Sequence, residues 1–199
     1  MPYVKVQNAV FPDNLLTIDF EAGELSSASW SNEMGPPVDR QWWVVYTKTR
    51  QEKRLASELL DREIPYYLPM VRRRHVYRGR KAISETPLFV SYLFLFANPH
   101  ERIRSLATHR IAHLIPVPDG RALAEDLARI HRLIETEVPL TVEERLAPGT
   151  TVRVRHGSLA GLEGSILSRC RTTRLVVSIR FLQRSVSFEI DDFMLEAIS

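Results

Sequence analysis

The fold of this chain is decided near its C-terminus, where residues 149–164 read Gly149-Thr-Thr-Val-Arg-Val-Arg-His-Gly-Ser-Leu-Ala-Gly-Leu-Glu-Gly164. Two further β-prone runs follow, Arg174-Leu-Val-Val-Ser-Ile179 and Arg184-Ser-Val-Ser-Phe-Glu-Ile190. Short strands with alternating apolar and polar residues, separated by glycine turns within about fifty residues, are typical of a small, strongly bent β-barrel. The sequence therefore predicts an all-β domain over residues 149–199.

Two different sequence patterns precede this domain. Residues 137–148 lack periodicity and contain Pro139 and Pro148, so we expect a linker. Before them, apolar residues recur at helical spacing from about residue 122 to residue 136, which predicts an amphipathic helix. We assign this helix to the end of a preceding domain.

The sequence predicts both strands and helices in that preceding domain. Gln41–Tyr46 and Pro87–Phe96 are apolar, β-prone runs of the kind found in central strands. Thr49 and Glu52 have the spacing of a capping box, which predicts that a helix begins there. A basic hairpin is expected between the two runs, and a short helix after Pro99. Residues 39–136 are therefore predicted to form an α+β domain, an antiparallel sheet flanked by helices.

Charge is segregated along the chain although the net charge is only +3. Residues 1–38 contain one lysine and five acidic side chains, and we expect an acidic extension that is partly ordered at most. Residues 39–118 contain 15 basic and 7 acidic side chains. This balance points to a polyanion or an acidic protein surface as partner, while a merely solvated, arginine-rich surface explains it equally well.

The composition argues against several functional classes. The lone Cys170 excludes an intramolecular disulfide and a cysteine-built metal site. The six histidines form no convincing metal-ligand pair, and there is no glycine-rich phosphate loop or nucleophile elbow. No apolar run is long enough to span a bilayer, and no secretory signal is evident. We expect a cytoplasmic, monomeric binding protein that is no enzyme and uses no metal or cofactor.

Both halves of the chain resemble one family, the NusG-type transcription elongation and antitermination factors. Residues 41–118 resemble the family's N-terminal domain, notably at Trp42-Trp-Val-Val-Tyr-Thr-Lys48 and Pro87-Leu-Phe-Val-Ser-Tyr-Leu-Phe-Leu95. Residues 149–198 resemble its KOW domain, an SH3-like barrel. The turn that carries the KOW motif consists of Gly157, Ala160, Gly161, Leu162, Glu163 and Gly164. Within the family, the specialised paralogues of the RfaH and UpxY kind look most similar.

The resemblance implies a function. The N-terminal domain would bind the β′ clamp helices of bacterial RNA polymerase and suppress pausing or termination. The KOW domain would recruit a further partner, such as a small-subunit ribosomal protein or a termination factor. The positions that match the family's polymerase-binding aromatics are Tyr46, Phe89, Tyr92 and Phe94.

Basic side chains supply a second candidate surface, for phosphates of upstream or non-template DNA. Its members are Lys48, Arg54, Arg72, Arg73, Arg74, Arg78, Arg80 and Lys81. The alternative function is a ribosome-associated, RNA-binding KOW protein, since aromatic sheet faces near arginines can stack bases.

The chain departs from the family at one informative place. Phe89-Val-Ser-Tyr92 stands where family members have a Pro-Gly or Pro-Asn pair between the aromatics. Loss of the proline and glycine predicts a more regular strand through this segment.

Overall fold

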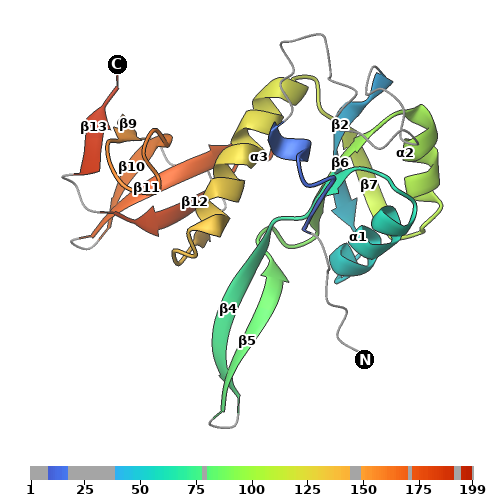
Figure 1. Cartoon of the computed structure of the whole chain (residues 1–199), viewed down its shortest axis with the longest axis horizontal. Helices are drawn as coiled ribbons and strands as arrows, with labels where there is room; N and C mark the ends of the chain where they lie inside the picture. Colours follow the sequence, from blue (N-terminus) through green and yellow to red (C-terminus); the bar gives the residue numbers. More distant parts are fainter. Residues whose placement is uncertain are drawn as a thin grey trace. The chain divides into compact units, whose positions relative to one another are not determined.

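The computed structural model describes residues 9–17, 39–77, 80–143, 149–169, 172–190 and 194–198. The chain divides into two compact units, Met1–Arg121 and Ala122–Ser199, which are coloured along the sequence in Figure 1. Most of the acidic extension, together with Arg78 and Cys170, lies outside the described residues.

A five-stranded antiparallel sheet in the order β1-β3-β6-β2-β7 forms the centre of the first unit. Its strands are β1 (Val10–Phe11), β2 (Gln41–Thr47), β3 (Tyr66–Tyr67), β6 (Tyr92–Ala97) and β7 (Ile111–Pro116). The two apolar runs of the sequence supply β2 and β6, which pair along their length inside the sheet. This confirms the expected antiparallel sheet of the N-terminal part.

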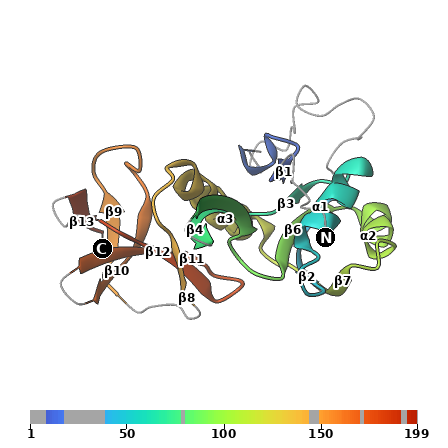
Figure 2. The same ribbon diagram turned by 90° about the horizontal axis from the view of Figure 1, so that it is seen from below.

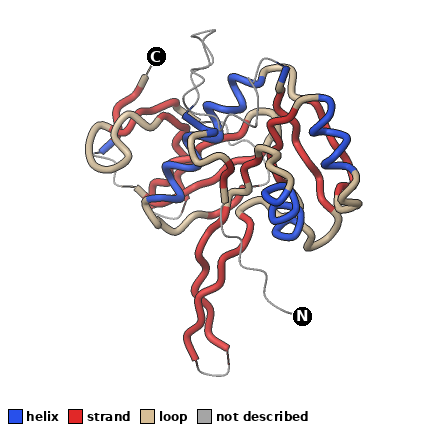
Figure 3. The backbone as a smooth tube through the Cα atoms, turned by 45° about the vertical axis from the view of Figure 1, so that its right-hand side comes forward, coloured by secondary structure: helices blue, strands red, loops and turns tan. Residues whose placement is uncertain are grey.

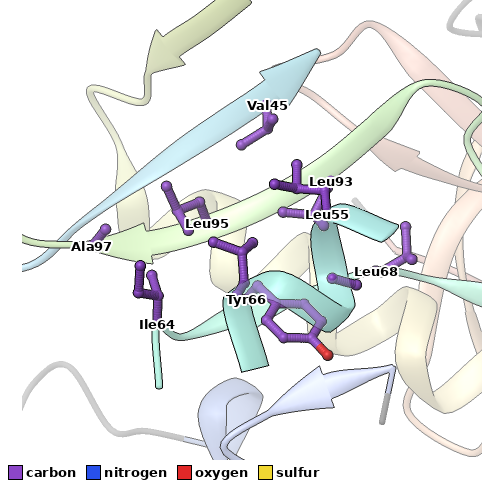
Figure 4. Packing of buried hydrophobic residues seen from close by; sticks show 10 residues of the cluster. Val45, Leu55, Ile64, Tyr66, Leu68, Leu93, Leu95 and Ala97 are labelled. Carbon is purple, nitrogen blue, oxygen red and sulfur yellow. The ribbon is translucent and has the colours of Figure 1, made fainter. Parts of the chain in front are cut away.

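Alternation along β2 and β6 gives the sheet two different faces. Val45, Leu93 and Leu95 point to one face, where helix α1 (Glu52–Asp61) contributes fully buried Leu55 and Leu59. Figure 4 shows Val45, Leu55, Leu93 and Leu95 packed together with other residues of the same cluster. Apolar burial on this scale, at about 25 cal/mol per Å², is the main stabilising term of such a unit.

Tyr66 of β3 belongs to the same cluster. Burial, with a smaller contribution from the Asp61 carboxylate, raises the pKa of Tyr66 to about 12. The phenol therefore stays neutral in the core at neutral pH.

Helix α2 (Pro99–Leu106) begins with strong local signals. Asn98 accepts a hydrogen bond from the Glu101 N–H, Glu101 accepts one from the Asn98 N–H, and Pro99 occupies the first helical turn. Glu101 also forms a buried ion pair with Arg40 at 2.6 Å. The expected short helix after Pro99 is confirmed, although the reciprocal capping box lies here and not at Thr49 and Glu52.

A separate two-stranded sheet, β4 (Met70–Tyr77) with β5 (Arg80–Pro87), forms a long hairpin. It stands apart from the five-stranded sheet in Figures 1 and 3, and we call it the arm. This is the basic hairpin that the sequence predicts.

Part of the N-terminal extension belongs to the first unit. β1 pairs with β3, and a short 3-10 helix, Leu15–Thr17, buries Leu15 completely. Residues 9–17 are thus part of the fold, which periodicity over so few residues does not reveal.

The second unit is dominated by a six-stranded antiparallel sheet in the order β13-β9-β10-β11-β12-β8, whose strands are labelled in Figure 2. They are β8 (Thr141–Glu143), β9 (Thr151–Val154), β10 (Glu163–Arg169), β11 (Thr172–Ile179), β12 (Arg184–Glu189) and β13 (Leu195–Ala197). Val177, Ile179 and Val186 are buried in it. The expected all-β C-terminal part is confirmed.

Helix α3 (Gly120–Glu135) enters this second unit at Ala122. Its Asp126, nearly fully buried, accepts hydrogen bonds from the main-chain N–H of Arg180 at 3.0 Å and from Nη2 of the same residue at 3.2 Å. Arg180 lies in the turn between β11 and β12, so a polar contact holds the helix against the sheet.

Two features of this unit differ from the domain boundaries expected above. The sequence predicts this helix at the end of the N-terminal domain, whereas its residues from Ala122 onward belong to the second compact unit. The expected linker contains β8, which pairs with β12 through Val142 opposite Val186. A three-residue strand carries too little alternation to be read from sequence, and tertiary pairing decides it.

Candidate protein- and nucleic-acid-binding surfaces

An aromatic patch lies on the sheet face opposite α1. Tyr46 of β2 stands directly between Tyr92 of β6 and His113 of β7, and directly opposite residues share a face. The Tyr46 and Tyr92 rings meet edge to face at 5.4 Å, and the His113 ring stacks on Tyr46 at 6.2 Å. Ile115, two residues along β7 and 43% exposed, continues the same face. We call these four residues the aromatic patch.

The patch combines apolar area with polar ring atoms. Tyr46 is 40% exposed, and Tyr92 is half-buried beside it. Aromatic rings of this kind are favoured anchors in protein interfaces, because they bury a large apolar area while their hydroxyl or imidazole groups tolerate water. The sequence predicts the two tyrosines as contact residues but does not predict His113 and Ile115. Their alternation along Ile111–Pro116 was the signal that could have found them.

The other two predicted contact residues lie in the core. Phe94 is completely buried and stacks on Tyr67 at 6.4 Å, while Phe89 is 1% exposed. Phe94 does share the face of Tyr92, as the period of two requires. Phe94 lies two residues further along β6, however, where it and its cross-strand partner Val44 are both buried. The structure therefore brings Tyr46 and Tyr92 together on the surface and removes Phe89 and Phe94 from it.

The segment between Phe89 and Tyr92 is a tight turn, so the prediction of a more regular strand is wrong. The Tyr92 N–H donates to the Phe89 carbonyl at 3.2 Å, and Ser91 has a φ of 66°. Two tertiary hydrogen bonds hold Ser91 there. Its carbonyl accepts from the Thr47 N–H at 2.8 Å, and its N–H donates to the Glu52 carboxylate at 2.7 Å. The turn presents Val90, which is 71% exposed.

Replacing Ser91 by glycine is expected to stabilise the first unit. A left-handed φ strains a residue with a Cβ, and glycine relieves this at some cost in unfolded-state entropy, so the free energy of unfolding should rise by about 0.5–1 kcal/mol. Urea unfolding followed by tryptophan fluorescence measures the change. Ser84→Gly, within strand β5, is the control and should lower stability. A loss of stability in Ser91→Gly would contradict the left-handed turn.

The arm carries most of the predicted phosphate-binding residues. Arg72 and Arg73 are exposed, with Arg72 lying 3.6 Å from Glu85 of the facing strand. Arg72 and Arg73 are consecutive on β4 and therefore face opposite sides of it, and Arg74 belongs to the same strand. Arg80 and Lys81 lie on β5. The arm therefore offers arginine on both faces and not one basic stripe.

Lys48 and Arg54 lie apart from the arm's own strands. Lys48 is exposed in the turn after β2, and Arg54 is exposed on α1. Within the described part of the chain, neither side chain forms an ion pair. The nucleic-acid surface that the sequence predicted is thus divided between the arm and the start of α1.

The motif of the C-terminal sheet is a turn between β9 and β10. Gly157 and Gly161 have φ values of 86° and 81°, which only glycine adopts without strain. Gly164, the second residue of β10, lies so close to β11 that a Cβ would be 2.5 Å from the Val176 carbonyl oxygen. Leu162 is buried between them. These residues shape the fold and offer no reactive group.

No group of three or more potential metal ligands occurs among the described residues. None of the helices in the described part of the chain combines the length and apolar character needed to cross a membrane.

The first unit thus combines an α+β fold with an exposed aromatic sheet face and an arginine-bearing arm, and a second unit built mainly on a β-sheet follows it in the sequence. A model of the family described as NusG, transcription termination factor nusG, matches residues 40–147. This is more than half of the chain, which therefore belongs to the NusG family of transcription factors. The match confirms the NusG-type resemblance, while the closeness to RfaH and UpxY stays a prediction.

Two solved structures are similar over most of the chain. One, described as the domain interaction in Thermotoga maritima NusG, has 16% sequence identity and a TM-score of 0.46, and covers 82% of this chain and 100% of that chain. The other, from the MjSpt4:Spt5 complex in conformation B, has 12% identity and a TM-score of 0.28, with coverage of 79% and 97%.

Proposed function

We propose that the chain is a cytoplasmic, monomeric transcription elongation or antitermination factor that binds the β′ clamp helices of bacterial RNA polymerase through the aromatic patch. Bound there, it suppresses pausing or termination. The single observation that carries the proposal is the exposed patch around Tyr46 and Tyr92, because it lies in the part of the chain that matches the family. The polar atoms of its rings suit a surface that is exposed before it is bound.

The second unit has a separate role in this proposal. It recruits a further protein, such as a small-subunit ribosomal protein or a termination factor. Phe181, 37% exposed in the turn after β11, is an apolar side chain available for such a contact. The unit needs no reactive group for this role.

Purified protein and core RNA polymerase provide the test. Surface-immobilised protein should capture core polymerase at moderate salt, with an affinity that changes little as salt rises, since apolar contacts are weakly screened. Absence of binding would contradict the proposal and would favour the alternative function, a ribosome-associated protein that binds RNA. The described surface of the C-terminal sheet gives that alternative little support, because Arg153 and Arg155 pair with Glu163 and Glu196.

The arm adds nucleic-acid contacts to this function. Arg72 and Arg73 are expected to contact phosphates of upstream or non-template DNA. Replacing both by glutamine should reduce the slope of log K against log salt concentration by about 2 for duplex DNA, since each phosphate contact releases about one counterion. Fluorescence anisotropy across a salt series measures the slope.

The control for this substitution is Arg155→Gln, just after β9, whose side chain is 50% exposed compared with 66% for Arg72. It should leave the slope unchanged. An equal slope for the arm variant and the wild type would remove the arm from the nucleic-acid surface.

A further inference from the structure

Glu52 is a buried carboxylate that does not cap its own helix. It opens α1 and is 6% exposed, yet α1 has Gln51 at its N-cap and no side-chain capping hydrogen bond. Its Oε1 instead accepts the Ser91 N–H at 2.7 Å, across 39 residues of sequence. A carboxylate in the first turn also interacts favourably with the helix dipole. Glu52 is therefore held in place by α1 and holds the turn that presents Val90.

Lys53, the next residue, makes an equivalent contact with the arm. Its Nζ donates to the main-chain carbonyl of Glu85 at 2.6 Å. Glu85 lies near the base of β5, three residues before Leu88, whose N–H donates to the Pro69 carbonyl beside the start of β4. A lysine ammonium normally remains in water, so a short bond to a carbonyl oxygen gives this side chain a fixed direction.

Consecutive residues of one helix thus hold both ends of the segment 85–91. One end is the base of the arm and the other is the Val90 turn, which runs directly into Tyr92 of the aromatic patch. Both bonds go to main-chain atoms, so they fix the path of the backbone whatever side chains that segment carries. The helix itself is anchored in the core by Leu55 and Leu59.

We propose that Glu52 and Lys53 are positioning residues of the binding surface. Through them, α1 sets the direction of the arm and the place of the Val90 turn relative to the aromatic patch. Polymerase at the patch and nucleic acid along the arm are then contacted in one fixed geometry. The identity of these two partners rests on the proposed function, whereas the positioning itself does not.

The direction of the arm can be measured without any partner. Spin labels at Ile83 on the arm and Ala112 on β7, both exposed, report their separation in a full-length Cys170→Ser background. Lys53→Met should broaden the distance distribution clearly, with little change in melting temperature. Lys48→Met, the same change at an exposed lysine, should leave it narrow. A narrow, unshifted distribution in Lys53→Met would overturn the role of Lys53.

A double-mutant cycle tests Glu52 at the binding surface. Glu52→Ala should weaken polymerase binding about tenfold alone and less than about threefold in a Tyr92→Ala background, because coupled residues are not additive. Glu52→Gln keeps an acceptor oxygen and should recover most of the affinity. A merely destabilising role would instead give the same factor in both backgrounds and would overturn the role of Glu52.

The two proposals fail in different ways. A wild-type protein that does not bind polymerase contradicts the proposed function. The spin-label distances then still decide whether α1 positions the arm.

Discussion

Replacing Tyr46 and Tyr92 together by alanine is expected to weaken binding to core RNA polymerase by about a hundredfold or more, since aromatic anchors at the centre of an interface contribute about 2 kcal/mol each. The two rings contact each other at 5.4 Å on neighbouring strands, so their removal empties the middle of the patch. Tyr46 is 40% exposed, and the loss of both side chains should cost little stability. Binding isotherms together with urea unfolding curves separate the two effects.

Phe181→Ala is the matched control for this pair. Phe181 is 37% exposed, close to the value for Tyr46, and lies in the other unit. Its loss should leave polymerase affinity within about twofold, the range expected for side chains outside an interface. An unchanged affinity of the double tyrosine variant would move the polymerase contact to a different surface.

Phe94→Ala is expected to destabilise the first unit by about 3–5 kcal/mol, the range found when a buried phenylalanine is truncated. The side chain is completely buried and stacked on Tyr67, so its removal costs transfer free energy and leaves a cavity. Any loss of polymerase binding in this variant should follow the unfolded fraction. The midpoint of urea unfolding and the binding signal at several urea concentrations test this.

Val90→Ala serves as the comparison for Phe94→Ala. Val90 is 71% exposed, and its truncation should change stability by less than about 0.5 kcal/mol. A stable Phe94→Ala protein that no longer binds polymerase would restore Phe94 as a contact residue. That result would mean that its covered face opens when the partner binds.

Alternation along the strands allowed the two faces of the sheet to be predicted. It placed Tyr92 and Phe94 on one face, and the structure has them so. Alternation does not report how far along a face the covering extends, and for this reason Tyr92 is a surface residue and Phe94 a core residue. Exposure at the end of a sheet depends on packing against distant parts of the chain, which a local pattern does not contain.

The turn at Ser91 shows a second limit of local reasoning. Propensity correctly identifies Gly157 and Gly161 as turn residues, because nothing but their own conformational freedom is needed. Ser91 adopts a similar φ only because Thr47 and Glu52 hold its backbone. The spacing between Thr49 and Glu52 predicts that Glu52 forms half of a capping box. The same side chain in fact satisfies a donor 39 residues away, a pairing that only the tertiary structure supplies.

Because the arm is long, a small change in direction at its base displaces its tip by a larger distance. Each of its strands has eight residues, and at about 3.3 Å per residue such a strand is about 26 Å long. A rotation of about 10° at the base would therefore carry the tip through about 4.5 Å, more than the length of a hydrogen bond. Small differences in the residues at the base would be magnified into different reach at the tip. Substitutions far from any bound strand could thus redirect where along that strand the protein makes contact.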